Sequence, residues 1–104
     1  MDNYGTKRLT WQGIVIEIRY DPDWLESYRE TYGYPLAHLE IESISPAKEP
    51  LPMTETGYRS WFGAPAGVES DGGAVEFVRP WLEHEARSDS WKAGQAEHRE
   101  LTLF

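Results

Sequence analysis

The stretch Ile14-Val15-Ile16-Glu17-Ile18-Arg19-Tyr20 decides the fold, because its apolar residues recur at every second position. Successive side chains of a β-strand point to opposite faces. One face of this stretch is therefore wholly apolar or aromatic: Ile14, Ile16, Ile18 and Tyr20. The pattern predicts a strand that is half-buried on a hydrophobic core. Asp21-Pro22-Asp23 ends it, since proline lacks an N–H for the strand ladder.

A second stretch, Ala37 to Ile44, alternates in the same way. Its apolar face holds Ala37, Leu39 and Ile41, and its polar face holds His38, Glu40 and Glu42. Because the two stretches match in length and pattern, pairing them would bury a shared apolar face and place Glu17 and Arg19 near Glu40 and Glu42. The connection between them allows either strand direction, and we expect antiparallel pairing.

The residues flanking the first strand favour a turn and a helix. Gln12-Gly13 suits either a tight turn or a bulge, because glycine reaches positive φ without a Cβ clash. Trp24 to Tyr32 has aromatic and apolar residues at helical spacing, and Gly33 is typical of the position that ends a helix. We expect Asp21 or Asp23 to cap this helix.

The C-terminal half predicts one further helix, over Gly73 to Arg87, with Ser70 or Asp71 as its N-cap. Pro80 interrupts the pattern. The alternatives are a single kinked helix, which we favour, and an extended segment followed by a helix that begins at Pro80. Arg99 to Phe104 alternates between polar and apolar residues and predicts an added strand at a sheet edge.

Residues Ser45 to Gly67 carry prolines and glycines too densely for a regular element, yet they include several large apolar side chains. We expect a long loop packed onto the domain, and a flexible tail over residues 1–7. The predicted fold is therefore one small α+β domain over residues 1–104. It has a mainly antiparallel sheet of two to four strands, packed against one or two helices and a long aromatic loop.

Composition excludes several classes of protein. The 104 residues include 18 acidic and 10 basic side chains, giving a net charge of −8, which repels phosphate backbones and argues against nucleic-acid binding. The absence of cysteine excludes disulfides, thiolate metal sites and cysteine nucleophiles. No apolar run approaches the roughly 18 residues that span a bilayer, and the N-terminus lacks the features of a signal peptide. We expect a cytoplasmic protein that binds neither membranes nor cofactors.

The first candidate site lies in the predicted loop, because long loops often carry function. It offers hydroxyl, carboxylate, guanidinium and aromatic groups within a short stretch: Thr54, Glu55, Tyr58, Arg59 and Trp61. Tyrosine, arginine and tryptophan are enriched in binding hot spots. The alternative is that the aromatic residues fill the core of a small domain.

The second candidate site is His38 with Glu40 and Glu42, which share one face of the second strand. Imidazole and carboxylate groups bind divalent metals or act as general acids and bases. The alternative, which we favour, is an ordinary solvated sheet face. No metal or nucleotide motif accompanies this set, so no catalytic residue is predicted.

The segment Leu51 to Phe62, together with the upstream Ala37-His38-Leu39-Glu40-Ile41, resembles a block found in small uncharacterised proteins carried on bacterial plasmids and integrated elements. The resemblance implies a bacterial, cytoplasmic accessory protein and no activity. We therefore predict a non-enzymatic module that binds another protein, with a second copy at an exposed sheet edge as one such partner. The alternatives are a metal protein or enzyme that uses His38, Glu40 and Glu42, and an acidic mimic of nucleic acid.

Overall fold

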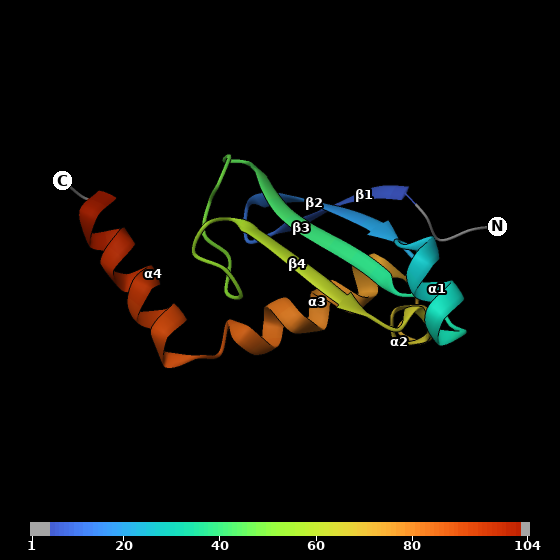
Figure 1. Cartoon of the computed structure of the whole chain (residues 1–104). Coiled ribbons are helices and arrows are strands. Elements are labelled where there is room, and N and C mark those ends of the chain that lie inside the picture. The colour runs from blue at the N-terminus through green and yellow to red at the C-terminus, as the bar shows by residue number, and fades with distance from the viewer. Residues whose placement is uncertain (1–4, 103–104) are drawn as a thin grey trace.

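In residues 5–102, four antiparallel strands form one sheet, in the order in which they occur along the chain (Figure 1). The computed structural model describes residues 5–102, and the side chains of residues 5–97. The strands are β1 (Gly5–Trp11), β2 (Ile14–Asp21), β3 (Ala37–Ser45) and β4 (Tyr58–Gly63). This arrangement confirms the predicted α+β fold and the antiparallel pairing of the two amphipathic strands.

β1 and β2 form a hairpin around the two-residue turn Gln12-Gly13. Both turn residues have positive φ, 48° and 80°, as the type I′ turn of a two-residue hairpin requires. Of the two predicted alternatives for Gln12-Gly13, the tight turn is therefore confirmed and the bulge is wrong. The predicted tail over residues 1–7 is wrong for residues 5–7, which begin β1. Residues 1–4 lie outside the described part of the chain.

α1 (Glu26–Tyr32) connects β2 to β3, and Gly33 ends it with a left-handed φ of 81°, as predicted. The predicted aspartate cap is wrong: Leu25 is at the N-cap position, without a capping side chain. The Asp21 carboxylate instead accepts the N–H of Asp23. Asp23 in turn pairs with Arg29, so local turn bonds and an ion pair occupy both carboxylates.

The predicted loop is wrong over Tyr58–Gly63, which form β4 and pair with β3. Prolines and glycines surround this segment at Pro52, Gly57 and Pro65, but β4 itself contains only the terminal Gly63. The many prolines and glycines therefore lie before and after β4, and they do not prevent the segment between them from forming a strand. The irregular connection from β3 to β4 is shorter, over residues 46–57.

In the described part of the chain, the sheet is followed by α2 (Pro65–Ser70), α3 (Ala74–Glu85) and α4 (Asp89–Thr102). Pro80 lies inside α3, which confirms the single helix. Gly73 is the N-cap of α3, so the predicted cap at Ser70 or Asp71 is wrong, because α2 and its C-cap occupy those positions. The expected strand over Arg99 to Phe104 is also wrong as far as Thr102, where the backbone is helical. Residues 103 and 104 lie outside the description.

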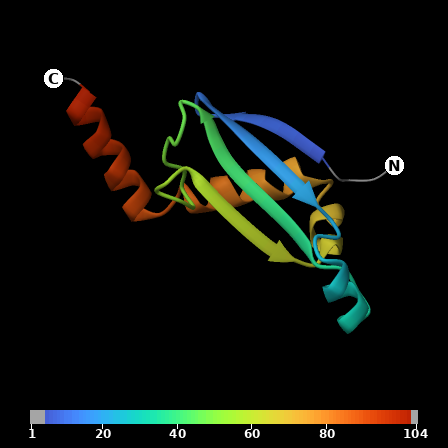
Figure 2. The ribbon, with the colours of Figure 1, turned by 45° about the horizontal axis from the view of Figure 1, so that its top comes forward.

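The sheet has two different faces, which we call the inner face and the outer face. The inner face is apolar, and α2 and α3 cover it (Figures 1 and 2). The residues with no exposed surface come from both layers: Ile16, Ile18, Ala37, Leu39, Ile41, Val68, Val78 and Leu82. No helix of the described residues covers the outer face. None of the helices in residues 5–102 is long and apolar enough to cross a membrane.

Candidate functional site

One guanidinium organises the charged side chains at the centre of the outer face. Arg19 on β2 binds three carboxylates, with N···O distances of 2.7 Å to Glu17, 3.2 Å to Glu40 and 3.1 Å to Glu42. The strand register explains this arrangement, because Arg19 lies directly opposite Glu40 and Glu17 lies opposite Glu42. Like charges in directly opposite positions repel each other. The guanidinium between them therefore relieves the repulsion that the register creates.

Partial burial of Arg19 opposes its charge, yet hydrogen bonds to the three carboxylates raise its pKa. Tyr58 on β4 extends the network, because its hydroxyl donates to Glu40 at 2.5 Å. That hydrogen bond, assisted by Arg19, lowers the pKa of Glu40, while burial acts in the opposite direction. Glu40 is therefore held as a carboxylate by donors on both neighbouring strands.

Three aromatic rings lie beside this network on the outer face. His38 and Phe62 are opposite each other on β3 and β4, and their rings stack with centroids 4.3 Å apart and planes at 12°. Trp24, which precedes α1, contacts both rings, at 4.9 Å from Phe62 and 5.1 Å from His38. We call these three residues the aromatic cluster. Phe62 follows Trp61, which contacts α3, so its side chain points to the opposite face of β4.

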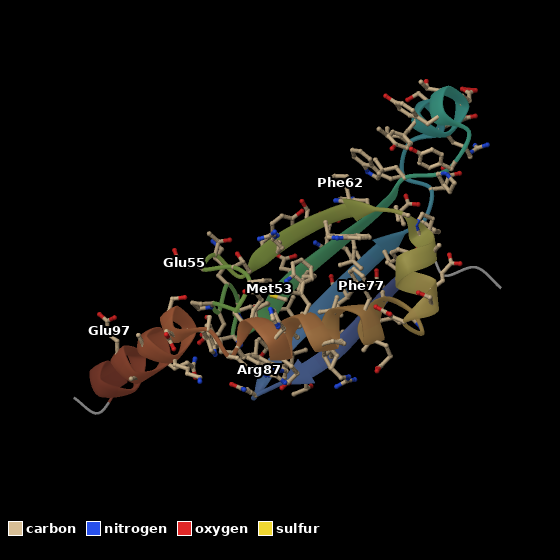
Figure 3. All side chains as sticks on the ribbon, turned by 90° about the horizontal axis from the view of Figure 1, so that it is seen from below. Met53, Glu55, Phe62, Phe77, Arg87 and Glu97 are labelled. Carbon is tan, nitrogen blue, oxygen red and sulfur yellow. The ribbon has the colours of Figure 1, made fainter. Side chains whose placement is uncertain are left out.

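Tyrosines of α1 and of the chain just after it form a second group of rings that contact one another. Tyr28 lies 4.5 Å from Tyr32 and 5.9 Å from Tyr34, measured between ring centroids. α1 buries none of its residues and stands at the end of the sheet (Figures 2 and 3). Four aromatic side chains here are substantially exposed: Trp24 at 41%, Tyr32 at 58%, Tyr34 at 54% and Phe62 at 46%. These four rings therefore expose much of their surface at this end of the sheet.

The structure divides the residues predicted as a binding site between the two faces. Tyr58 is on the outer face, whereas Arg59 and Trp61 are on the inner face. The Arg59 guanidinium lies 5.4 Å above the ring of Trp81, and the Trp61 ring is 4.7 Å from Phe77 of α3. This division follows from the alternation of β4, since neighbouring residues of a strand point to opposite faces.

Thr54 and Glu55 remain in the irregular connection before β4. The Thr54 hydroxyl donates to the carbonyl of Tyr58 at 2.8 Å and so supports the start of the strand. Glu55 is exposed and lies at a groove of about 490 Å³ between this connection and α4. Trp91 and Gly94 line the groove on the α4 side. The five predicted residues therefore do not share one surface.

His38, Glu40 and Glu42 do share the outer face, but each has another partner. His38 is stacked in the aromatic cluster, and Arg19 binds both glutamates. Within the described residues, no group of three or more histidine and acidic side chains is arranged to hold a metal ion. On this face His38 is therefore stacked between aromatic rings, and Arg19 binds Glu40 and Glu42.

Sequence reasoning missed Trp24, Phe62 and the tyrosines of α1 as surface residues. A signal existed in α1, because seven helical residues with tyrosine, glutamate and arginine cannot bury all of their rings. For Phe62, the signal was the alternation of Tyr58, Ser60 and Phe62 against Arg59 and Trp61.

A comparison with protein families matches most of the chain. The family model described as the KlcB third domain matches residues 4–91. The chain belongs to this family. The KlcB third domain is a family name associated with plasmids, in agreement with the resemblance seen in the sequence. The match covers the sheet, α1, α2, α3 and the first residues of α4. The chain matches no curated protein and no solved structure.

Proposed function

We propose that this KlcB third domain is a non-enzymatic protein-binding module of the bacterial cytoplasm, and that it binds its partner through the outer face of the sheet and α1. The observation that carries the proposal is the exposed aromatic surface formed by Trp24, Tyr32, Tyr34 and Phe62. Contiguous exposed apolar surface on a small domain marks interaction sites. Aromatic rings are also the side chains on which binding energy concentrates.

The surroundings of the rings favour a protein partner with a basic contact region. The chain carries a net charge of −8, and the exposed Glu26 and Glu30 lie on α1 beside the tyrosines. Charges at the rim of an interface act mainly on the association rate and on partner choice, whereas buried rings supply affinity. A basic, partly apolar surface complements both properties.

The outer-face network supports the same proposal and disfavours the mimicry of nucleic acid. Mimicry requires an array of uncompensated carboxylates, but Arg19 neutralises much of the charge of Glu17, Glu40 and Glu42. The family name adds that such a domain is the third one of KlcB. A domain that occurs beside other domains in one protein is suited to binding a partner protein on which the other domains act.

The test is capture by a photo-crosslinking amino acid placed at Tyr34, followed by identification of the captured protein and titration of the purified pair. The double variant Trp24→Ala, Tyr32→Ala should raise the Kd about 30-fold or more, because each hot-spot ring contributes about 1–2 kcal/mol. The control is Glu76→Ala with Arg79→Ala, which removes an exposed ion pair on α3. The control should leave the Kd unchanged.

Two results would overturn the proposal. One is a captured protein whose affinity is the same for the aromatic variant and for the wild type. The other is equal capture from a probe placed at Arg79, on the helical layer. Circular dichroism of each variant shows whether the fold is retained.

A further inference from the structure

The backbone of β4 offers hydrogen-bonding groups at the edge of the sheet. The carbonyl of Gly57 accepts the N–H of Ser43 at 2.8 Å, and Arg59, Trp61 and Gly63 follow in register with alternate residues of β3. In an antiparallel ladder, every second residue bonds to the same neighbouring strand. The intervening residues Tyr58, Ser60 and Phe62 therefore direct their N–H and C=O groups away from β3.

The hydrogen bonds of Tyr58 support this assignment of which backbone groups point away from β3. Its carbonyl accepts the hydroxyl of Thr54 at 2.8 Å and that of Thr56 at 3.3 Å, so it points out of the sheet. The groups of Ser60 and Phe62 have no backbone partner on that side among residues 5–102. β4 forms the border of the sheet in Figure 2. α3 contacts β4 only from the inner face, through Phe77 and Trp81, and so does not cover its edge.

The two edges of the sheet differ in protection. β1 presents the exposed cations Lys7 and Arg8 at its edge, and charged residues of this kind block strand addition. β4 contains no lysine, proline or acidic residue, and its one charge, Arg59, lies on the inner face over Trp81. An edge without such protection is suited to pairing with another strand.

We propose that β4 pairs with β4 of a second copy of this chain, antiparallel, about a two-fold axis at Ser60. The residues Tyr58-Arg59-Ser60-Trp61-Phe62 are self-complementary in this register. Tyr58 would lie opposite Phe62 of the partner subunit, and Arg59 opposite Trp61 of the partner subunit. Two-fold symmetry forms each of these pairs twice.

Both cross-strand pairs are favourable. Aromatic residues that face each other across antiparallel strands stabilise the pair, and a guanidinium is attracted to the face of an indole ring. Ser60 would exchange two backbone hydrogen bonds with Ser60 of the partner subunit. The net charge of −8 on each copy opposes association, so the dimer should strengthen as salt rises and screens the repulsion.

The first test replaces Ser60 by proline. The N–H that proline removes points out of the edge and is not used within one chain, so the fold should survive. The pairing loses one ladder bond from each protomer, and we expect the dimer Kd measured by sedimentation to rise about tenfold or more. The control Ser60→Ala keeps the N–H and should leave the Kd unchanged.

The second test uses a chain that has no cysteine of its own. Ser60→Cys would place two thiols on the symmetry axis, where paired Cα atoms are about 5.5 Å apart, within the roughly 4.4–6.8 Å that a disulfide spans. Mild oxidation should give a covalent dimer in high yield. The control Thr6→Cys, on β1, should give little covalent dimer, because its thiols lie far from the β4 interface.

A wild-type chain that stays monomeric over the whole concentration and salt series would overturn the proposal. A dimer that crosslinks at Thr6→Cys and not at Ser60→Cys would also overturn it, since β1 would then form the interface. The β4 pairing shares Phe62 with the proposed partner-binding surface, whereas Trp24 and Tyr32 lie outside β4. Trp24→Ala with Tyr32→Ala should leave this dimer intact, so the two proposals can fail separately.

Discussion

The inner and outer faces of the sheet are made by alternate residues of the same strands, yet they are stabilised in different ways. Leu39 and Ile41 on the inner face have no exposed surface. Glu40, between them, is partly exposed and bound by Arg19 and Tyr58. The free energy of folding should therefore depend on the inner face, while the outer face can vary with its partner. Substitutions on each face test this difference.

Leu39→Ala should produce the largest loss of free energy of unfolding. Leu39 is fully buried on a central strand, and removing a buried leucine side chain costs about 2–5 kcal/mol in lost transfer energy and cavity formation. Urea denaturation should show the loss as a lower midpoint at an unchanged slope. Glu42→Ala on the outer face of the same strand is the control. A loss below about 1 kcal/mol for Leu39→Ala would show that the inner face is not a packed core.

Trp61→Ala and Phe62→Ala compare the faces at adjacent positions of one strand. Trp61 packs against Phe77 of α3, so its truncation should cost about 2 kcal/mol, below the range for a fully buried aromatic residue. Phe62 is 46% exposed and contributes mainly its ring pairs, worth about 0.5–1 kcal/mol. Thermal denaturation of both variants shows which substitution costs more stability. Equal losses would remove the distinction between the faces at β4.

Arg19→Met tests how the outer face tolerates its own charges. The substitution leaves Glu17, Glu40 and Glu42 without their common partner, and we expect a loss of about 1 kcal/mol at low salt. The loss should shrink as salt screens the carboxylates. Arg79→Met, which removes a single exposed ion pair with Glu76, should change stability by much less. A loss independent of salt would indicate packing rather than charge.

Tyr58→Phe should have the smallest effect on the free energy of unfolding, and this effect should depend on pH. The Tyr58 hydroxyl, helped by Arg19, holds the pKa of Glu40 below the ordinary glutamate value of 4.5. A lowered folded-state pKa gives stability that is present above the unfolded-state pKa and lost as pH falls through the folded-state pKa. The deficit of the variant should be about 0.5 kcal/mol at neutral pH, given the exposure of both groups. It should disappear in acid, as urea titrations at several pH values would show. A deficit that grows in acid would contradict this assignment.

The inner face could be predicted from the sequence because period-two alternation is a local property. Ile14 to Tyr20 and Ala37 to Ile44 carry it over enough residues to define both strands and their shared face. β4 was not predicted because the prolines and glycines on both sides of it indicate a loop when Ser45 to Gly67 is taken as one segment. The assignment of a strand near Arg99 failed because alternation over so few residues does not exclude a helix.

The aromatic cluster could not be predicted in the same way, since it depends on strand register. Phe62 meets His38 only because β4 pairs with β3 in one alignment, and Trp24 reaches both rings across a turn. Nothing local to Trp24 encodes that meeting. The predicted loop site held Tyr58 and Arg59 together as sequence neighbours, but a strand separates neighbours by face.

Gly63 closes β4, and its position relative to Trp61 bears on which variants of this domain can arise. A Cβ atom at Gly63 would come within 2.4 Å of the Trp61 ring. Any other residue there requires the indole to leave its place beside Phe77. Variation at position 63 should therefore be accommodated by a shift of the indole ring or by a smaller residue at position 61. The two positions are thus expected to change together during divergence, and a library that randomises both would recover folded pairs that single substitutions do not.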